Sequence, residues 1–172
     1  MNKLLAVLAV FLICAGAFAA EFVTDDGSVR LRSKTISMNK KAVNASGGAT
    51  LLAQNDTSSL SAECEELKLV YSGKQSKGLD AVSQAVIKKS VVLVYKSGES
   101  VYNIWCDSAF YENSLLTLAG NVKIEYTDGS APMTATGSRA MINLSRDAGE
   151  DETIFSIEGD PERARITVPL NK

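Results

Sequence analysis

Alternating runs of apolar and polar residues, separated by short turns, recur along this 172-residue chain. The clearest is LTLAGNVKIEYTDGSAPMTATGSRAMINL at residues 116–144, in which two alternating segments flank a Gly- and Pro-containing turn. Similar runs are KSVVLVYKSGES and TIFSIEGDPERARITV. A period of two residues is typical of a half-buried strand, and closely spaced turns join antiparallel strands. The sequence therefore predicts an antiparallel all-β fold.

The alternating runs form four degenerate repeats, which begin near residues 33, 64, 106 and 137. Each predicted repeat holds a strand, a polar turn, a second strand, a glycine and a third strand. Gly47 and Gly159 hold the place of Gly120, whereas Lys89 stands there in the second copy, which is the weakest. Units of this size cannot bury their apolar faces alone, so neighbouring copies must stack. We expect a sheet folded on itself, as a β-jellyroll or a short solenoid of hairpins.

The same alternation predicts which side chains face the interior, because a slip of one residue would turn every side chain to the other face. The predicted interior is mostly aliphatic. Its candidate residues are Ile36, Met38, Leu51, Leu67, Leu69, Leu93, Leu116, Leu118, Val122, Ile124, Tyr126, Ile142, Phe155 and Ile157.

Two cysteines, Cys64 and Cys106, occupy one repeat position and are predicted to face outward. If their strands are neighbours, the cysteines lie roughly 4.5–5.5 Å apart and a disulfide is possible. If the strands are not neighbours, the distance is too great. The alternative is a pair of unrelated, half-buried thiols.

The N-terminal segment has the layout of a secretory signal peptide. Lys3 precedes an apolar run from Leu4 to about Ala15, and Ala17-Phe18-Ala19 matches a cleavage site. We therefore expect a signal peptide at residues 1–20 and one domain at residues 21–172. An uncleaved anchor is the alternative, because the apolar run approaches the roughly 17 residues that a membrane span requires.

Composition argues against several classes of function. The chain has no histidine, which removes the usual general base and the commonest zinc ligand. Its formal net charge of -2 offers no basic surplus for nucleic acid. The carboxylates are scattered, and no pair is placed for general acid–base catalysis. We expect neither an enzyme nor a metal or cofactor site.

The C-terminal half resembles the LptA/OstA-like domain of lipopolysaccharide-transport proteins. Gly120, Asn121 and Val122 match the family's T-x-x-G-N-V turn, and Asp107 keeps the Asp of its A-D-x strand, where the next copy has Ser138 instead. Gly159-Asp160-Pro161 resembles a late G-x-P turn. The similarity is clear over residues 105–168 and faint over residues 30–100.

The resemblance implies an incompletely closed β-jellyroll whose apolar groove takes the acyl chains of lipid A. It also implies a periplasmic bridge from the inner to the outer membrane, built by edge-strand pairing with other jellyroll proteins or with further copies of this chain. Two alternatives remain open at this stage. One is an LptC-like component anchored in the inner membrane, and the other is a secreted structural β-repeat protein with a closed core that binds no lipid.

Overall fold

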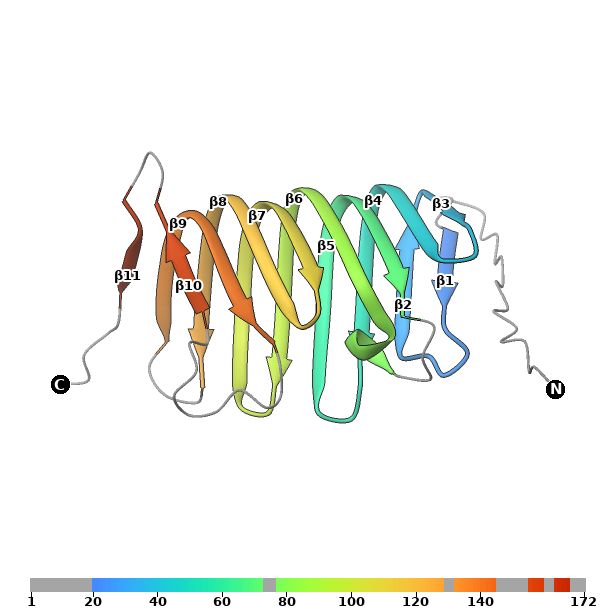
Figure 1. Ribbon diagram of the computed structural model, residues 1–172, viewed down its shortest axis with the longest axis horizontal. Helices are drawn as coiled ribbons and strands as arrows, with labels where there is room; N and C mark the ends of the chain where they lie inside the picture. The colour runs from blue at the N-terminus through green and yellow to red at the C-terminus, as the bar shows by residue number, and fades with distance from the viewer. Residues whose placement is uncertain (1–19, 73–76, 129–131, 145–154, 160–162, 168–172) are drawn as a thin grey trace.

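The computed structural model describes residues 20–72, 77–128, 132–144, 155–159 and 163–167, which form one antiparallel sheet folded on itself (Figure 1). The sheet has eleven strands and is accompanied by one short 3-10 helix. In chain order they are β1 (Ala20–Val23), β2 (Val29–Ser33), β3 (Thr35–Met38), β4 (Ala42–Gln54), β5 (Ser58–Tyr71), η1 (Gly78–Ala81), β6 (Val82–Ser97), β7 (Ser100–Glu112), β8 (Leu115–Thr127), β9 (Met133–Asn143), β10 (Phe155–Glu158) and β11 (Arg165–Thr167). The predicted antiparallel all-β fold is confirmed.

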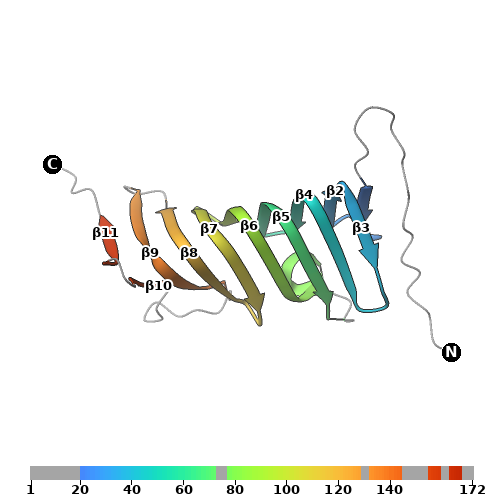
Figure 2. The same cartoon turned by 90° about the horizontal axis from the view of Figure 1, so that it is seen from above.

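Most strands that follow one another in the chain lie side by side in the sheet. Their order is β1-β2-β4-β5-β6-β7-β8-β9-β10, while β3 pairs with β4 and β11 pairs with β9. The sheet is therefore elongated, with β1 and β3 at one end and β10 and β11 at the other (Figure 2). No helix in these described ranges has the length and apolarity needed to cross a membrane.

Short polar turns connect the strands. The side-chain oxygen of Asn55 accepts hydrogen bonds from the backbone N–H groups of Thr57 and Ser58, which closes the turn between β4 and β5. Asn113 and Ser114, both with positive φ, form the two-residue turn between β7 and β8. Asn tolerates this conformation and bonds to the local backbone, which explains its place at these turns.

Every long strand bends near its middle, and the bends align as a crease along the sheet. The pairing register shifts there between Ser46 and Ala49, Glu63 and Glu66, Lys88 and Val91, Trp105 and Ser108, and Ala119 and Val122. The crease divides the sheet into two walls. Wall A contains β3, β10, the first halves of β4, β6 and β8, and the second halves of β5, β7 and β9. Wall B contains β1, β2, β11 and the remaining halves, and the strands of one wall run obliquely across those of the other (Figure 1).

The repeated glycine lies within this crease. Two consecutive residues with positive φ bend each of β4, β6 and β8: Gly47-Gly48, Lys89-Ser90 and Gly120-Asn121. Lys89 (φ 66°) therefore occupies the place of Gly120 (φ 75°), as the repeat alignment predicted, and takes the same positive φ although it is not a glycine. In β4 and β8, however, the glycine does not separate two strands as predicted, because the segments on either side of it are halves of one strand. Gly159 does stand between two strands, β10 and β11.

The strands β5, β7 and β9 bend in a different way. Each slips by one residue at the crease, so that the inward parity changes from Cys64 to Leu67 on β5 and from Cys106 to Ala109 on β7. Cys64, Cys106 and Gly137, where three of the predicted repeats begin, lie at these slips. The repeat is therefore a pair of strands, one with each kind of bend.

The core lies between the two walls and runs the length of the sheet. Side chains from both walls meet there in one cluster. The largest fully buried side chains are Leu31, Leu51, Leu60, Leu69, Ile87, Leu93, Ile104, Leu116, Leu118, Ile124 and Ile142.

Candidate functional site

The apolar interior between wall A and wall B is the candidate site, and it contains most of the residues predicted to line it. Nine candidates are buried in it: Leu51, Leu67, Leu69, Leu93, Leu116, Leu118, Val122, Ile124 and Ile142. Four more are half-buried and pack against the same cluster: Ile36, Tyr126, Phe155 and Ile157. Their inward orientation agrees with the alternation, and their role in binding stays a prediction.

Met38 does not belong to the interior. Its side chain is 49% exposed, and it ends β3, a strand of four residues that pairs with β4. In the described sheet β3 pairs with β4 alone and its other edge is open. Met38 therefore stays exposed, although the alternation places it on the inward side.

The structure decides the open question of the disulfide against a bridge, and the predicted outward orientation of the two cysteines is wrong. Cys64 and Cys106 are free and buried. They lie on β5 and β7, and β6 separates these strands by about 10 Å in total, beyond disulfide reach. The prediction failed because it extended the parity of Leu67 back across the slip to Cys64.

Burial changes the chemistry of both thiols. It raises the pKa of Cys64 from 9.0 to about 11 and that of Cys106 to about 12. Desolvation disfavours the thiolate, which is the reactive form. These cysteines therefore act as small apolar side chains at the inner surface of the crease.

Tyrosines line the interior at the side opposite the crease. Tyr95, Tyr102 and Tyr126 are direct neighbours on β6, β7 and β8, with ring centroids 6.0 and 4.6 Å apart. Burial also raises the pKa of Tyr102 well above its usual range. The sequence contained a signal for this row, because Tyr95 and Tyr102 are placed symmetrically about the two-residue turn Gly98-Glu99 and therefore face each other in a hairpin.

The two walls join along the crease and end, on the opposite side, in two rows of turns. We call the space between these rows the mouth. Inward side chains of both walls are nevertheless almost fully covered: Leu93 and Ile104 of wall B and Leu118 of wall A are each 0% exposed. The interior therefore forms a packed core in this conformation, and an apolar ligand must separate the walls or replace side chains to enter.

The interior carries no charge among the described residues, whose only buried polar members are Ser28 and Ser33. Charges lie instead on the outer surface of the crease. Asp107 accepts a hydrogen bond from the side chain of Asn121 at 2.9 Å, and Glu66 pairs with Lys89. The Lys89 ammonium lowers the pKa of the Glu66 carboxyl below its usual value. In the described ranges, no three His, Cys, Asp or Glu side chains gather as metal ligands would.

Sequence comparison finds no matching protein family and no matching curated protein. Structural comparison does find a match. It is the crystal structure of LptH, the LptA-homologous periplasmic component of the lipopolysaccharide transport device from Pseudomonas aeruginosa, with a TM-score of 0.57. The match covers 84% of this chain and 95% of LptH, at 11% sequence identity.

This chain has an LptA-like fold.

The LptA-like fold includes the region where the sequence resemblance was faint, because the structural match extends over most of the chain. At 11% identity the likeness concerns the arrangement of strands. Any shared activity has to be argued from the interior itself.

Proposed function

We propose that this protein is a periplasmic carrier that holds the acyl chains of lipopolysaccharide between wall A and wall B. In this role it forms part of a bridge from the inner to the outer membrane. One observation carries the proposal: in the described residues, an apolar interior without charges runs the length of a sheet whose long strands pass from one wall to the other at the crease.

Acyl chains suit such an interior physically. Each buried CH₂ group contributes about 0.8 kcal/mol, so a chain of ordinary length can replace contacts between the walls. The side chains of Leu118 and Ile124 lie on opposite walls and would contact the chain from both sides. The tyrosine row near the mouth would meet the more polar part of the lipid, since tyrosine has an apolar ring and a polar hydroxyl.

The ends of the sheet suit assembly into a bridge. The strands β1 and β3 at one end, and β10 and β11 at the other, each have one edge without a partner strand in the described sheet. Ile166 of β11 is 53% exposed. Exposed edges pair with strands of other chains, so the partners we propose are jellyroll proteins of the same bridge or further copies of this chain.

Photo-crosslinking tests the carrier function. A crosslinking amino acid at Leu118 or Ile124 should label lipopolysaccharide, because both side chains face inward. The matched controls are Thr117 and Glu125, which are adjacent to Leu118 and Ile124 in β8 and whose side chains face outward. Labelling from the inward pair alone supports the proposal.

A structural β-repeat protein that binds no lipid is the second candidate, favoured by the nearly complete burial of the interior. It predicts no labelling from any of the four positions in a folded protein. Periplasmic release rests on cleavage of residues 1–20, of which residues 1–19 lie outside the described ranges. Mass spectrometry of the mature N-terminus separates release from LptC-like anchoring, since an intact Met1 would indicate an anchor.

A further inference from the structure

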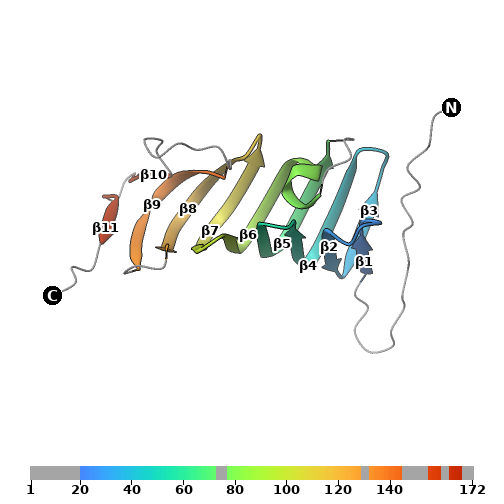
Figure 3. The ribbon, with the colours of Figure 1, turned by 90° about the horizontal axis from the view of Figure 1, so that it is seen from below.

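The helix η1 (Gly78–Ala81) lies across the mouth, and we call it the strap. It belongs to the connection between β5 and β6. The end of β5 that precedes it and the start of β6 that follows it both lie in wall A. Seen from the side opposite the crease, it lies over the strands at the N-terminal half of the sheet (Figure 3). It packs against β4, β5 and β6.

The strap is attached to wall B by contacts at its first residue. The backbone N–H of Gly78 donates a 3.0 Å hydrogen bond to Oγ of Ser28, just before β2. The backbone of Gly78 also lies against the end of β4, where an added Cβ would come within 2.7 Å of the carbonyl oxygen of Gln54. The strap therefore connects the two walls at the side opposite the crease.

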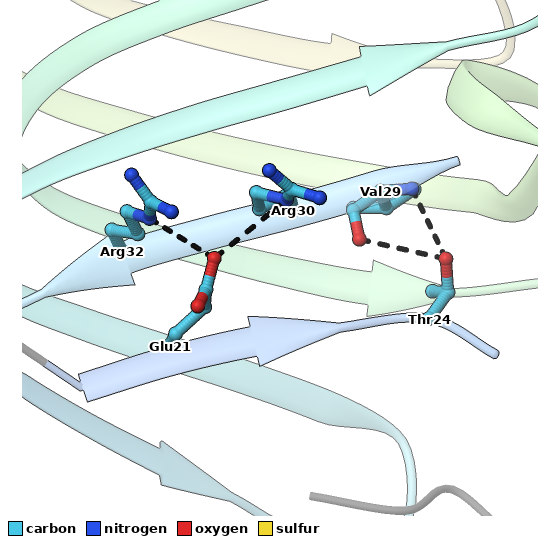
Figure 4. A network of polar contacts seen from close by, with 5 residues as sticks. All are labelled: Glu21, Thr24, Val29, Arg30 and Arg32. Carbon is cyan, nitrogen blue, oxygen red and sulfur yellow. Dashed lines mark hydrogen bonds and ion pairs between the residues drawn. The ribbon is translucent and has the colours of Figure 1, made fainter. Parts of the chain in front are cut away.

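The turn that holds Ser28 is itself closed by hydrogen bonds. The N–H of Ser28 donates to the Asp26 carboxylate, and the N–H of Val29 donates to Oγ1 of Thr24. Figure 4 shows Thr24 beside Val29, next to the ion pairs of Glu21 with Arg30 and Arg32 in the same hairpin. Ser28 thus provides a fixed acceptor, and the strap is the part that can leave it.

Leu79 of the strap inserts into the apolar interior. Its side chain is 8% exposed and belongs to the same cluster as the inward residues of both walls. Unlike those residues, Leu79 is held by a four-residue helix and not by a strand ladder. It is an apolar group that can be withdrawn without unpairing the sheet.

We propose that the space filled by Leu79 is an acyl-chain subsite, and that the strap covers it reversibly and is displaced when a lipid enters. This inference rests on the proposed lipid-carrier function. Binding then requires the displaced form, so the apparent affinity equals the intrinsic affinity multiplied by the fraction of molecules in which the strap is displaced. Any change that weakens the attachment of the strap should tighten lipid binding.

The first test compares two serine variants of the full chain. Ser28→Ala removes the acceptor for Gly78, whereas Ser33→Ala removes a hydrogen bond of another buried serine, from Oγ to the carbonyl of Ser46 at the crease. Ser28→Ala should raise the affinity for lipid A about five-fold, because the lost hydrogen bond attaches the strap. Ser33→Ala should leave the affinity unchanged, because its hydrogen bond lies away from the strap. Leu79→Ala should tighten binding as well, because it empties the subsite.

The second test follows the strap directly. Addition of lipid A should accelerate hydrogen exchange at the amide of Gly78 and tryptic cleavage after Lys77, which immediately precedes the strap. Deacylated lipid A saccharide should do neither, because it lacks the chain that competes with Leu79.

The outcomes separate the two proposals. If lipid A binds the wild type, but Ser28→Ala and Ser33→Ala bind it equally and exchange at Gly78 is unchanged, the strap inference is wrong and the carrier function stands. If no variant binds lipid A while all of them are folded by circular dichroism, both are overturned.

Discussion

The two buried thiols show how single residues depend on the crease. Cys64 and Cys106 face the core only because their strands slip by one residue. A simple alternation counted from Leu67 or Ala109 places both outside. The slip shows in the sequence only as a change of phase between Ala62-Cys64 and Leu67-Leu69, and an alternation counted from one side alone misses it.

These thiols should make the protein sensitive to alkali. Burial raises the pKa of Cys64 from 9.0 to about 11, so above pH 9 the thiol ionises in the unfolded chain and stays protonated in the folded one. Stability that is fully present below pH 9 is therefore lost as the pH rises towards 11. At about 1.4 kcal/mol for each pH unit, Cys64 contributes a loss on the order of 2 kcal/mol.

Urea unfolding measured between neutral pH and pH 10.5 checks this expectation. The free energy of unfolding should fall more steeply with pH in the wild type than in a Cys64→Ala, Cys106→Ala variant. Tyr102 and the other buried tyrosines are present in both proteins, so the difference in slope reports the thiols. Parallel pH profiles would contradict the assignment.

At the scale of strands, the crease requires a backbone conformation that few residues tolerate. In β8 this conformation falls on Gly120, and Asp107 of β7 covers the site on its outer side. An added Cβ at Gly120 would come within 2.8 Å of Cβ of Asp107. The requirement for glycine here is therefore both conformational and steric.

Gly120→Ala should lower the free energy of unfolding by about 2–3 kcal/mol, since it adds a steric contact to the usual cost of positive φ. Gly98→Ala is the matched control. Gly98 also has positive φ (57°), but nothing lies within 4 Å of its added Cβ. It should lose only about 1 kcal/mol. Equal losses in denaturant titrations would show that Asp107 does not restrict the site.

The sequence predicted the strands better than their ends and connections. The period of two identified the sheet and placed all but one of the candidate interior residues correctly, because apolar residues occupy nearly every inward position of the long strands. It left out Leu31, Leu60 and Ile104, which are fully buried as well. The prediction for Met38 was wrong because alternation cannot identify an edge strand. The sequence does not reveal the strap, since a four-residue helix has no period of its own and one leucine does not indicate burial.

At the scale of the whole molecule, each strand depends on its immediate neighbours. The ladder runs from β1 to β10 without long-range crossovers, and the strands at both ends are short. In such a linear arrangement stability is greatest where neighbours lie on both sides.

Hydrogen exchange followed by mass spectrometry should therefore show a gradient. Amides of β5 to β8 should exchange slowest, and those of β1, β3, β10 and β11 should exchange fastest. Gly120→Ala should speed exchange most in β7, β8 and β9 and least in β1. Uniform protection along the sheet would indicate a single cooperative unit instead.

The alternation of the two kinds of bend also limits how a chain of this design can change in length. Strands that bend at two consecutive residues with positive φ alternate with strands that bend by a one-residue slip. Inserting or losing a single strand would therefore place two bends of the same kind side by side. Only whole pairs can be added. Each pair would extend the interior by about 10 Å, twice the spacing between strands. The length of such a protein can therefore change only in steps of one hairpin.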